Sequence, residues 1–171
     1  QPALETTRAR QVRSESQAVF VVDVSRSMLA SAGQGEPTRL DRARAVVARL
    51  RSEIKDVPAG IAGMTDRVLP YLFPTVDLPS FESTLRSSVL PDAPPPGEQG
   101  SRATTFEALT QLVGSGYFLP SAKHRACVLV TDGEGRPDAT DGTAAGAVGS
   151  ELDGDGGCSL VVVRVGGAGD R

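Results

Sequence analysis

Short apolar runs alternate with amphipathic segments along most of this chain of 171 residues. An apolar run rich in β-branched residues is typical of a strand that lies buried in a parallel sheet. Apolar residues that recur three or four positions apart indicate instead a helix with one buried face. Runs of the first kind predict five strands, at residues 18–22, 59–64, 68–73, 126–130 and 158–165.

Helical spacing fills most of the intervals between these strands. Leu40, Ala43 and Val47 recur at helical spacing, and Thr38 with Asp41 three residues later resembles a capping box that starts the helix. The predicted helices cover residues 38–54, residues 77–90, a segment that begins at Phe106, and residues 141–152.

The alternation of strands and helices predicts an α/β domain with a Rossmann-like, doubly wound and mostly parallel sheet, covered by helices on both faces. The tight turn at Asp66-Arg67 predicts a hairpin, so residues 68–73 should form one antiparallel edge strand. We expect residues 18–22 at the centre of the sheet, between 59–64 and 126–130.

Composition fits one globular domain, with 39% hydrophobic and 23% charged residues. We expect residues 1–17, which are polar, to be a linker or N-terminal arm, and residues 18–171 to be the domain. The net charge of −3 leaves no basic footprint for nucleic acid. No apolar run approaches the ~20 residues that a membrane-spanning helix needs.

Acidic and hydroxyl side chains follow two of the predicted strands. Asp23, Ser25 and Ser27 alternate directly after residues 18–22, and Asp132 follows residues 126–130. The carboxyl ends of parallel strands are where such sheets bind ligands. Carboxylate and hydroxyl oxygens suit Mg²⁺, Mn²⁺ or Ca²⁺ and not zinc. The alternative is that Asp23 caps a helix and that the serines are ordinary turn residues.

The segments Phe20-Val-Val-Asp-Val-Ser-Arg-Ser27 and Val128-Leu-Val-Thr-Asp-Gly-Glu134 resemble those of a von Willebrand factor type A domain, the fold shared with integrin I domains. The resemblance covers roughly residues 18–166. In that family both segments belong to a metal-ion-dependent adhesion site.

The resemblance implies a ligand set for this chain. Asp23, Ser25 and Ser27 would form the first loop of the site and Asp132 the third loop. Glu134 would join the site directly or through water. The second loop of the family contributes one threonine, for which Thr104 is our choice and Thr105 the substitute. An alignment on Phe106 places Ala103 at that position instead.

The implied function is protein binding, in adhesion or assembly, and not catalysis. A divalent cation, first of all Mg²⁺ and otherwise Mn²⁺ or Ca²⁺, would bridge to an Asp or Glu of a protein partner. One alternative is a structural domain with an incomplete metal site. A Mg²⁺-dependent hydrolase is the weaker alternative, because the single histidine, His124, precedes its strand and should lie at the opposite end of the sheet from Asp23.

The same resemblance implies a bacterial protein and, as its location, the soluble extracytoplasmic part of a membrane-anchored protein; a cytoplasmic location is the alternative. The first residue, Gln1, suits a piece of a longer protein. The family usually adds a helix and a sixth strand after residues 158–165, so either the chain is truncated or another segment, such as 1–17, supplies the closing strand.

Cys127 and Cys158 lie in apolar runs with a spacing that matches no zinc motif. They should begin neighbouring strands at similar depth. We expect both thiols to be free and buried, with a disulfide as the alternative in an oxidising compartment.

Overall fold

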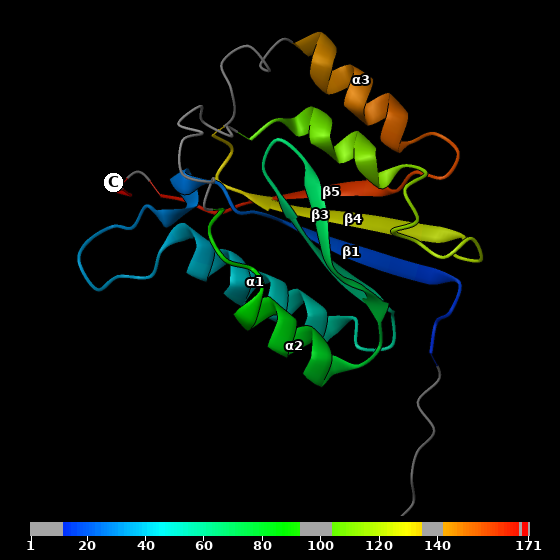
Figure 1. Ribbon diagram of the computed structural model, residues 1–171, viewed down its shortest axis with the longest axis horizontal. Helices are drawn as coiled ribbons and strands as arrows, with labels where there is room; N and C mark the ends of the chain where they lie inside the picture. The colour runs from blue at the N-terminus through cyan, green and yellow to red at the C-terminus, as the bar shows by residue number, and fades with distance from the viewer. Residues whose placement is uncertain (1–11, 93–103, 135–141, 168, 171) are drawn as a thin grey trace, which may run out of the picture.

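Five strands form one mixed sheet in the order β3-β2-β1-β4-β5 (Figure 1). The computed structural model describes residues 12–92, 104–134, 142–167 and 169–170. The strands are β1 (Ser16–Asp23), β2 (Ala59–Met64), β3 (Val68–Thr75), β4 (His124–Thr131) and β5 (Ser159–Arg164). All neighbouring pairs are parallel except β2 with β3. The predicted central strand and antiparallel edge strand are therefore confirmed.

The central strand starts earlier than the apolar pattern predicts. Ser16 and Gln17 precede that pattern, but they pair with His124 and Arg125 of β4. Gln17 is buried, and its side-chain oxygen accepts a hydrogen bond from the backbone N–H of Leu119. Backbone pairing thus extends β1 through two polar residues that an apolar-run criterion does not detect.

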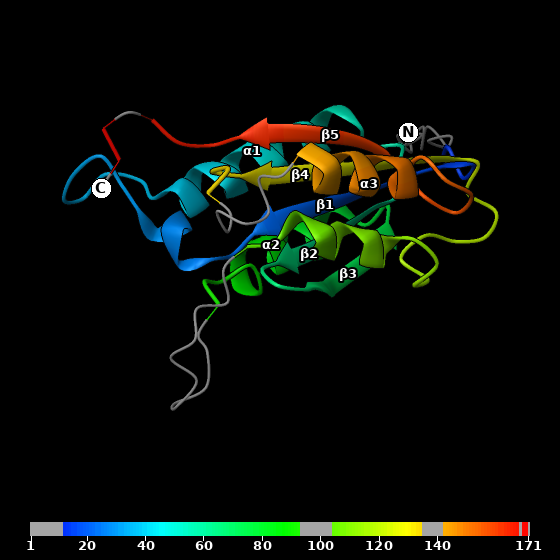
Figure 2. The ribbon, with the colours of Figure 1, turned by 90° about the horizontal axis from the view of Figure 1, so that it is seen from above.

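Helices cover both faces of the sheet, as predicted. In Figures 1 and 2, α1 and α2 lie on one face, whereas η2 and α3 lie on the other. The helical elements are η1 (Arg26–Leu29), α1 (Arg39–Glu53), α2 (Leu78–Ser87), η2 (Phe106–Leu112) and α3 (Gly142–Leu152). The segment from Phe106 is a 3₁₀ helix, and the capping box of Thr38 and Asp41 begins α1 as expected. None of the helices in the described ranges has the length and apolarity to cross a bilayer.

The central strand contributes to two apolar clusters. Phe20 and Val22 pack with α1 and α2, and Val19 and Val21 pack with η2 and α3. All four are at most 1% exposed. Alternate residues of a strand point to opposite faces, so β1 is held from both sides. Because β1 is packed on both faces, its last residue, Asp23, has a fixed position at the edge of the sheet.

A disulfide joins Cys127 of β4 to Cys158, the residue before β5. The two residues lie in or beside neighbouring strands, as expected, but the prediction of free thiols was wrong. Their Cα atoms are 5.8 Å apart, which lies within the range that a disulfide requires. The pairing of Ala126 with Ser159 in the parallel β4–β5 ladder produces this short separation.

Candidate metal centre

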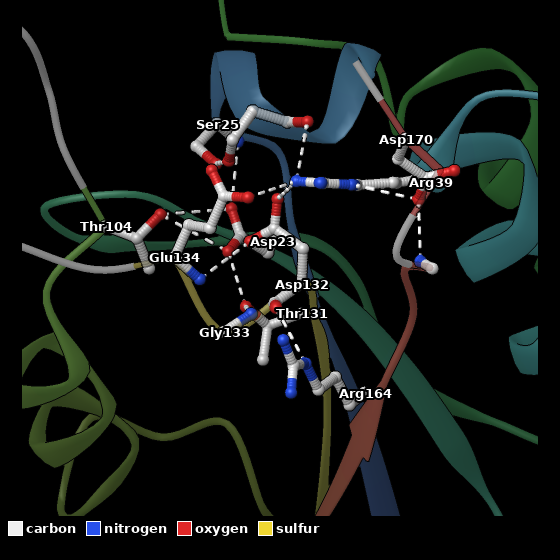
Figure 3. A network of polar contacts seen from close by, with 12 residues as sticks. Asp23, Ser25, Arg39, Thr104, Thr131, Asp132, Gly133, Glu134, Arg164 and Asp170 are labelled. Carbon is white, nitrogen blue, oxygen red and sulfur yellow. Dashed lines mark hydrogen bonds and ion pairs between the residues drawn. The ribbon is translucent and has the colours of Figure 1, made fainter. Parts of the chain in front are cut away.

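Asp23 ends the central strand with a carboxylate that is fully buried. Its Oδ1 accepts hydrogen bonds from the backbone N–H of Ser25 at 2.9 Å and from the hydroxyl of Thr104 at 3.1 Å. Its Oδ2 accepts one from the hydroxyl of Thr131 at 2.7 Å (Figure 3). Each of these donors is electrically neutral, so the buried negative charge has no basic side chain in direct contact among the described residues.

Electrostatics make the ionised form of Asp23 unfavourable. Burial raises the pKa of this carboxyl, and the nearby charge of Asp132 raises it further. Hydrogen bonds from Ser25 and Thr131 lower the pKa but do not reverse the shift. A divalent cation would offset the same charge that burial destabilises.

The turn after β1 places two hydroxyls side by side. Ser25 has an extended backbone and precedes η1, and its Oγ lies 3.0 Å from the Oγ of Ser27. Ser25 is buried and Ser27 is half-buried. The turn thus adds two neutral oxygen donors beside the carboxylate of Asp23.

The loop after β4 brings a second carboxylate to the same edge. Gly133 has a φ of 80°, a left-handed conformation that glycine adopts without strain. This conformation allows the backbone N–H of Glu134 to donate to Asp132 Oδ1 at 2.9 Å. The N–H of Gly133 donates to the Thr131 hydroxyl at 3.0 Å, so the hydroxyl that contacts Asp23 is itself held in place.

Arg39, the first residue of α1, reaches into this cluster (Figure 3). Its Nη1 donates to Asp132 Oδ2 at 2.8 Å and to Glu134 Oε1 at 2.6 Å, and its Nε donates to Asp170 Oδ2 at 3.2 Å. These acceptors, Glu134 foremost, raise the pKa of Arg39 above its already high value, so the guanidinium stays charged. The carboxylates of Asp132 and Glu134 are therefore paired with the permanent positive charge of Arg39.

Most of the residues named from the sequence come together in one network. Asp23 contacts Thr104 and Ser25, and Ser25 contacts Ser27. Arg39 contacts the backbone oxygen of Ser27 at 3.5 Å and also pairs with Asp132 and Glu134, so it links the two loops. Thr105 instead donates its backbone N–H to Thr65 O at 3.1 Å. Ala103 lies outside the described residues. The structure thus places the Thr104 hydroxyl beside Asp23, and the assignment of these residues, Thr104 included, as metal ligands stays a prediction.

Thr131, Arg39 and Asp170 belong to this network but were not identified as site residues from the sequence. Thr131 could have been found because it directly precedes Asp132. Arg39 carried a signal as well, since it is four and eight residues before Ala43 and Val47 and so shares their buried stripe. Asp170 follows a glycine-rich stretch, and no pattern singles it out.

The donor set fits a hard divalent cation. Asp23, Ser25, Ser27 and Thr104 present oxygen atoms only, which matches the ligands of Mg²⁺, Mn²⁺ and Ca²⁺. Within the described ranges, no group of three or more His, Cys, Asp or Glu residues is arranged to hold a metal ion. Hydroxyls, which do not count toward such a group, supply most of the donors around Asp23.

Comparison of the sequence with models of known protein families identifies one family. The profile of the von Willebrand factor type A domain matches residues 18–134. A search among curated proteins found no match.

Solved structures share the fold. A conserved hypothetical protein, BatB from Bacteroides thetaiotaomicron, is 24% identical with a TM-score of 0.64, over 87% of this chain and 66% of its own. An aerotolerance-related membrane protein from Bacteroides fragilis is 27% identical with a TM-score of 0.65, over 88% of this chain and 68% of its own. Manganese-loaded TRAP protein from Plasmodium vivax is 15% identical with a TM-score of 0.61, over 90% of this chain and 58% of its own. The chain thus spans about two thirds of the two Bacteroides proteins and less of TRAP.

Proposed function

Because this chain belongs to the von Willebrand factor type A family, we propose that the cluster around Asp23 binds one divalent cation and through it an acidic side chain of a protein partner. The observation that carries the proposal is the Asp23 carboxylate, which is 0% exposed and contacts only neutral donors in the described part of the chain. Burying a charge without an opposite charge is expensive. A bound cation would provide the opposite charge and so lower the free-energy cost of burying the ionised Asp23.

The residues of the cluster have distinct tasks. Asp23 supplies the charge, and Ser25, Ser27 and Thr104 supply neutral oxygens. The Thr104 hydroxyl donates its hydrogen to Asp23, which leaves its lone pairs available for a ligand bond. Because three of these four ligands are electrically neutral, a bound cation would keep most of its positive charge and would attract a further anionic ligand. When bound, the cation supplies a coordination position that a partner's carboxylate can fill.

The choice of metal follows from the donor chemistry. Mg²⁺ is our first choice, with Mn²⁺ and Ca²⁺ as alternatives, because all three prefer oxygen ligands. The manganese-loaded state of the TRAP structure supports a divalent cation on this fold.

We propose binding rather than catalysis. His124 begins β4 and pairs with Ser16 at the start of β1, so it lies at the opposite end of the sheet from Asp23. It cannot act as a general base for the serines of the cluster, because proton transfer requires hydrogen-bond distance.

For location, we propose the extracytoplasmic part of a membrane-anchored bacterial protein. The disulfide between Cys127 and Cys158 supports an oxidising compartment, where such bonds persist. The similarity to an aerotolerance-related membrane protein from Bacteroides fragilis points in the same direction.

One observation favours a second candidate function, a structural domain whose metal site is inactive. Arg39 already pairs with Asp132 and Glu134, so part of the negative charge is balanced without metal. Metal titration separates the candidates, since an inactive site binds no cation at millimolar concentration.

The bridging step can be tested without knowing the partner. Bound Mn²⁺ that keeps an exchangeable water enhances the relaxation of bulk water protons. Addition of a short peptide with one Asp and an amidated C-terminus should reduce this enhancement, because the Asp carboxylate replaces the water. The same peptide with Asn is the matched control and should have no effect. Equal effects of the two peptides, or no enhancement in the parent, would refute the bridging function.

A further inference from the structure

We propose that Arg39 is a built-in counter-cation of the metal site, which pairs with Asp132 and Glu134 and thereby weakens divalent-cation binding and confines it to the side of Asp23. This inference rests on the proposed metal site. It assigns to Arg39 a positioning role rather than direct contact with the cation.

The position of Arg39 is tightly determined. The residue is only 9% exposed, although arginine is normally a surface residue. Its Nη1 contacts Asp132 at 2.8 Å and Glu134 at 2.6 Å, and it lies 3.5 Å from the backbone oxygen of Ser27. One guanidinium nitrogen therefore lies between the first and third loops of the site.

The far side of the same guanidinium is also held. Nε of Arg39 donates to Asp170 Oδ2 at 3.2 Å, and the same oxygen accepts from Arg42 Nη2 at 2.5 Å and from the backbone N–H of Gly167 at 2.8 Å. The Asp170 side chain is 2% exposed. With both ends engaged, Arg39 cannot swing away without breaking several charge-assisted hydrogen bonds.

The two buried carboxylates consequently differ in their availability. Both oxygens of Asp132 are in use, since Oδ1 accepts from the N–H of Glu134 and Oδ2 accepts from Arg39. The direct partners of Asp23 are neutral and include hydroxyls that can reorient. A cation therefore binds beside Asp23, while Asp132 contributes charge at a distance.

Removal of the Arg39 charge should strengthen metal binding. It eliminates a positive charge a few ångströms from the site and releases Asp132 and Glu134 from their ion pairs. We expect Arg39→Gln to bind Mg²⁺ about tenfold more tightly than the parent, because a single and a double positive charge roughly 6 Å apart repel by about that factor at a water-like dielectric constant. The gain for Ca²⁺ should be larger, because Ca²⁺ accepts more oxygen ligands than Mg²⁺ and tolerates irregular geometry.

The experiment is a calorimetric titration of Mg²⁺ and Ca²⁺ into the metal-free parent, Arg39→Gln and Arg42→Gln. Arg42→Gln is the matched control, because it removes one positive charge from the same helix but contacts Asp170 and neither acid of the third loop. It should change the dissociation constants less than twofold. Melting temperatures report whether each variant folds, and Arg39→Met replaces Arg39→Gln if the latter does not.

Tighter binding with a raised preference for Ca²⁺ supports the proposal, because a purely structural loss does not increase affinity. Unchanged or weaker binding in Arg39→Gln, with binding in the parent, overturns it and leaves the metal site intact. If Arg39→Gln binds metal and the parent does not, the role of Arg39 as a counter-cation is supported and the proposed function of the parent is refuted. Absence of binding in both refutes both.

Discussion

Loss of the disulfide should destabilise the domain strongly. We consider the double variant Cys127→Ala/Cys158→Ala, which removes the bond that joins β4 to the residue before β5. The bond closes a loop with a sequence separation of 31 residues, and this loop contains Asp132, Glu134 and α3. The unfolded chain gains freedom when the loop opens, whereas the folded sheet still holds its strands through their backbone ladder.

The magnitude follows from the length of the loop. The chain-entropy relation for a closed loop of this length gives about 3.7 kcal/mol at 25 °C, within the usual range for a single disulfide. For a domain of this size, each kcal/mol shifts the melting temperature by roughly 2–4 °C, so the expected loss is on the order of 10 °C.

Urea unfolding measures the effect directly. The parent without reductant should have the higher midpoint, and the parent with reductant should fall to the level of the double variant. Cys127→Ala alone is a useful control, because either single substitution removes the whole bond. The single and double variants should therefore differ much less from one another than from the parent.

Two results would refute this reasoning. One is an equal unfolding midpoint for the parent with and without reductant. The other is a count of two free thiols in the denatured, non-reduced parent, which would restore the expectation of free cysteines.

Three further predictions concern the site. Thr104→Ala should weaken Mg²⁺ binding several-fold in calorimetry, whereas Thr105→Ala should not, because the Thr104 hydroxyl donates to Asp23 while the backbone of Thr105 bonds to Thr65. Burial raises the pKa of Asp23, so protons compete with metal at a higher pH than at an ordinary aspartate. The affinity should therefore begin to fall on acidification at a pH above the usual aspartate pKa, and an affinity that stays constant down to that pKa would contradict this. Hydrogen bonds from Arg42 and Gly167 lower the pKa of Asp170 to about 2, so its stabilisation is fully present above the usual aspartate pKa and is lost as the pH falls from there to about 2. Asp170→Asn should therefore lower the melting temperature near neutral pH, and the difference from the parent should shrink in acid.

The periodicity of apolar residues was sufficient to predict the fold. Phe20 and Val47 are buried, as the apolar periodicity of their own segments predicts. The turn at Asp66-Arg67 makes β3 antiparallel to β2 at the edge of the sheet. The polar start of β1 was missed, because Ser16 and Gln17 are held by pairing with β4 rather than by their own apolar character.

The site was predictable only where its residues are close in sequence. Asp23, Ser25 and Ser27 form one turn, which a short motif can reveal. Arg39 and Asp170 meet across 131 positions, and such a long-range ion pair leaves no local pattern. The redox state of the cysteines was unpredictable for the same reason, since the separation of their Cα atoms depends on the arrangement of the strands.

Calorimetric titration of Mg²⁺ and Mn²⁺ into the parent and Asp23→Asn tests the central claim most directly. The parent should bind one cation at millimolar or lower concentration, and Asp23→Asn should bind none. The variant should still melt at or above the temperature of the parent near neutral pH, because burial, which raises the pKa of Asp23, disfavours the charged carboxyl in the folded protein. Equal metal binding by the two proteins, or absence of binding in the parent at millimolar metal, would contradict the account.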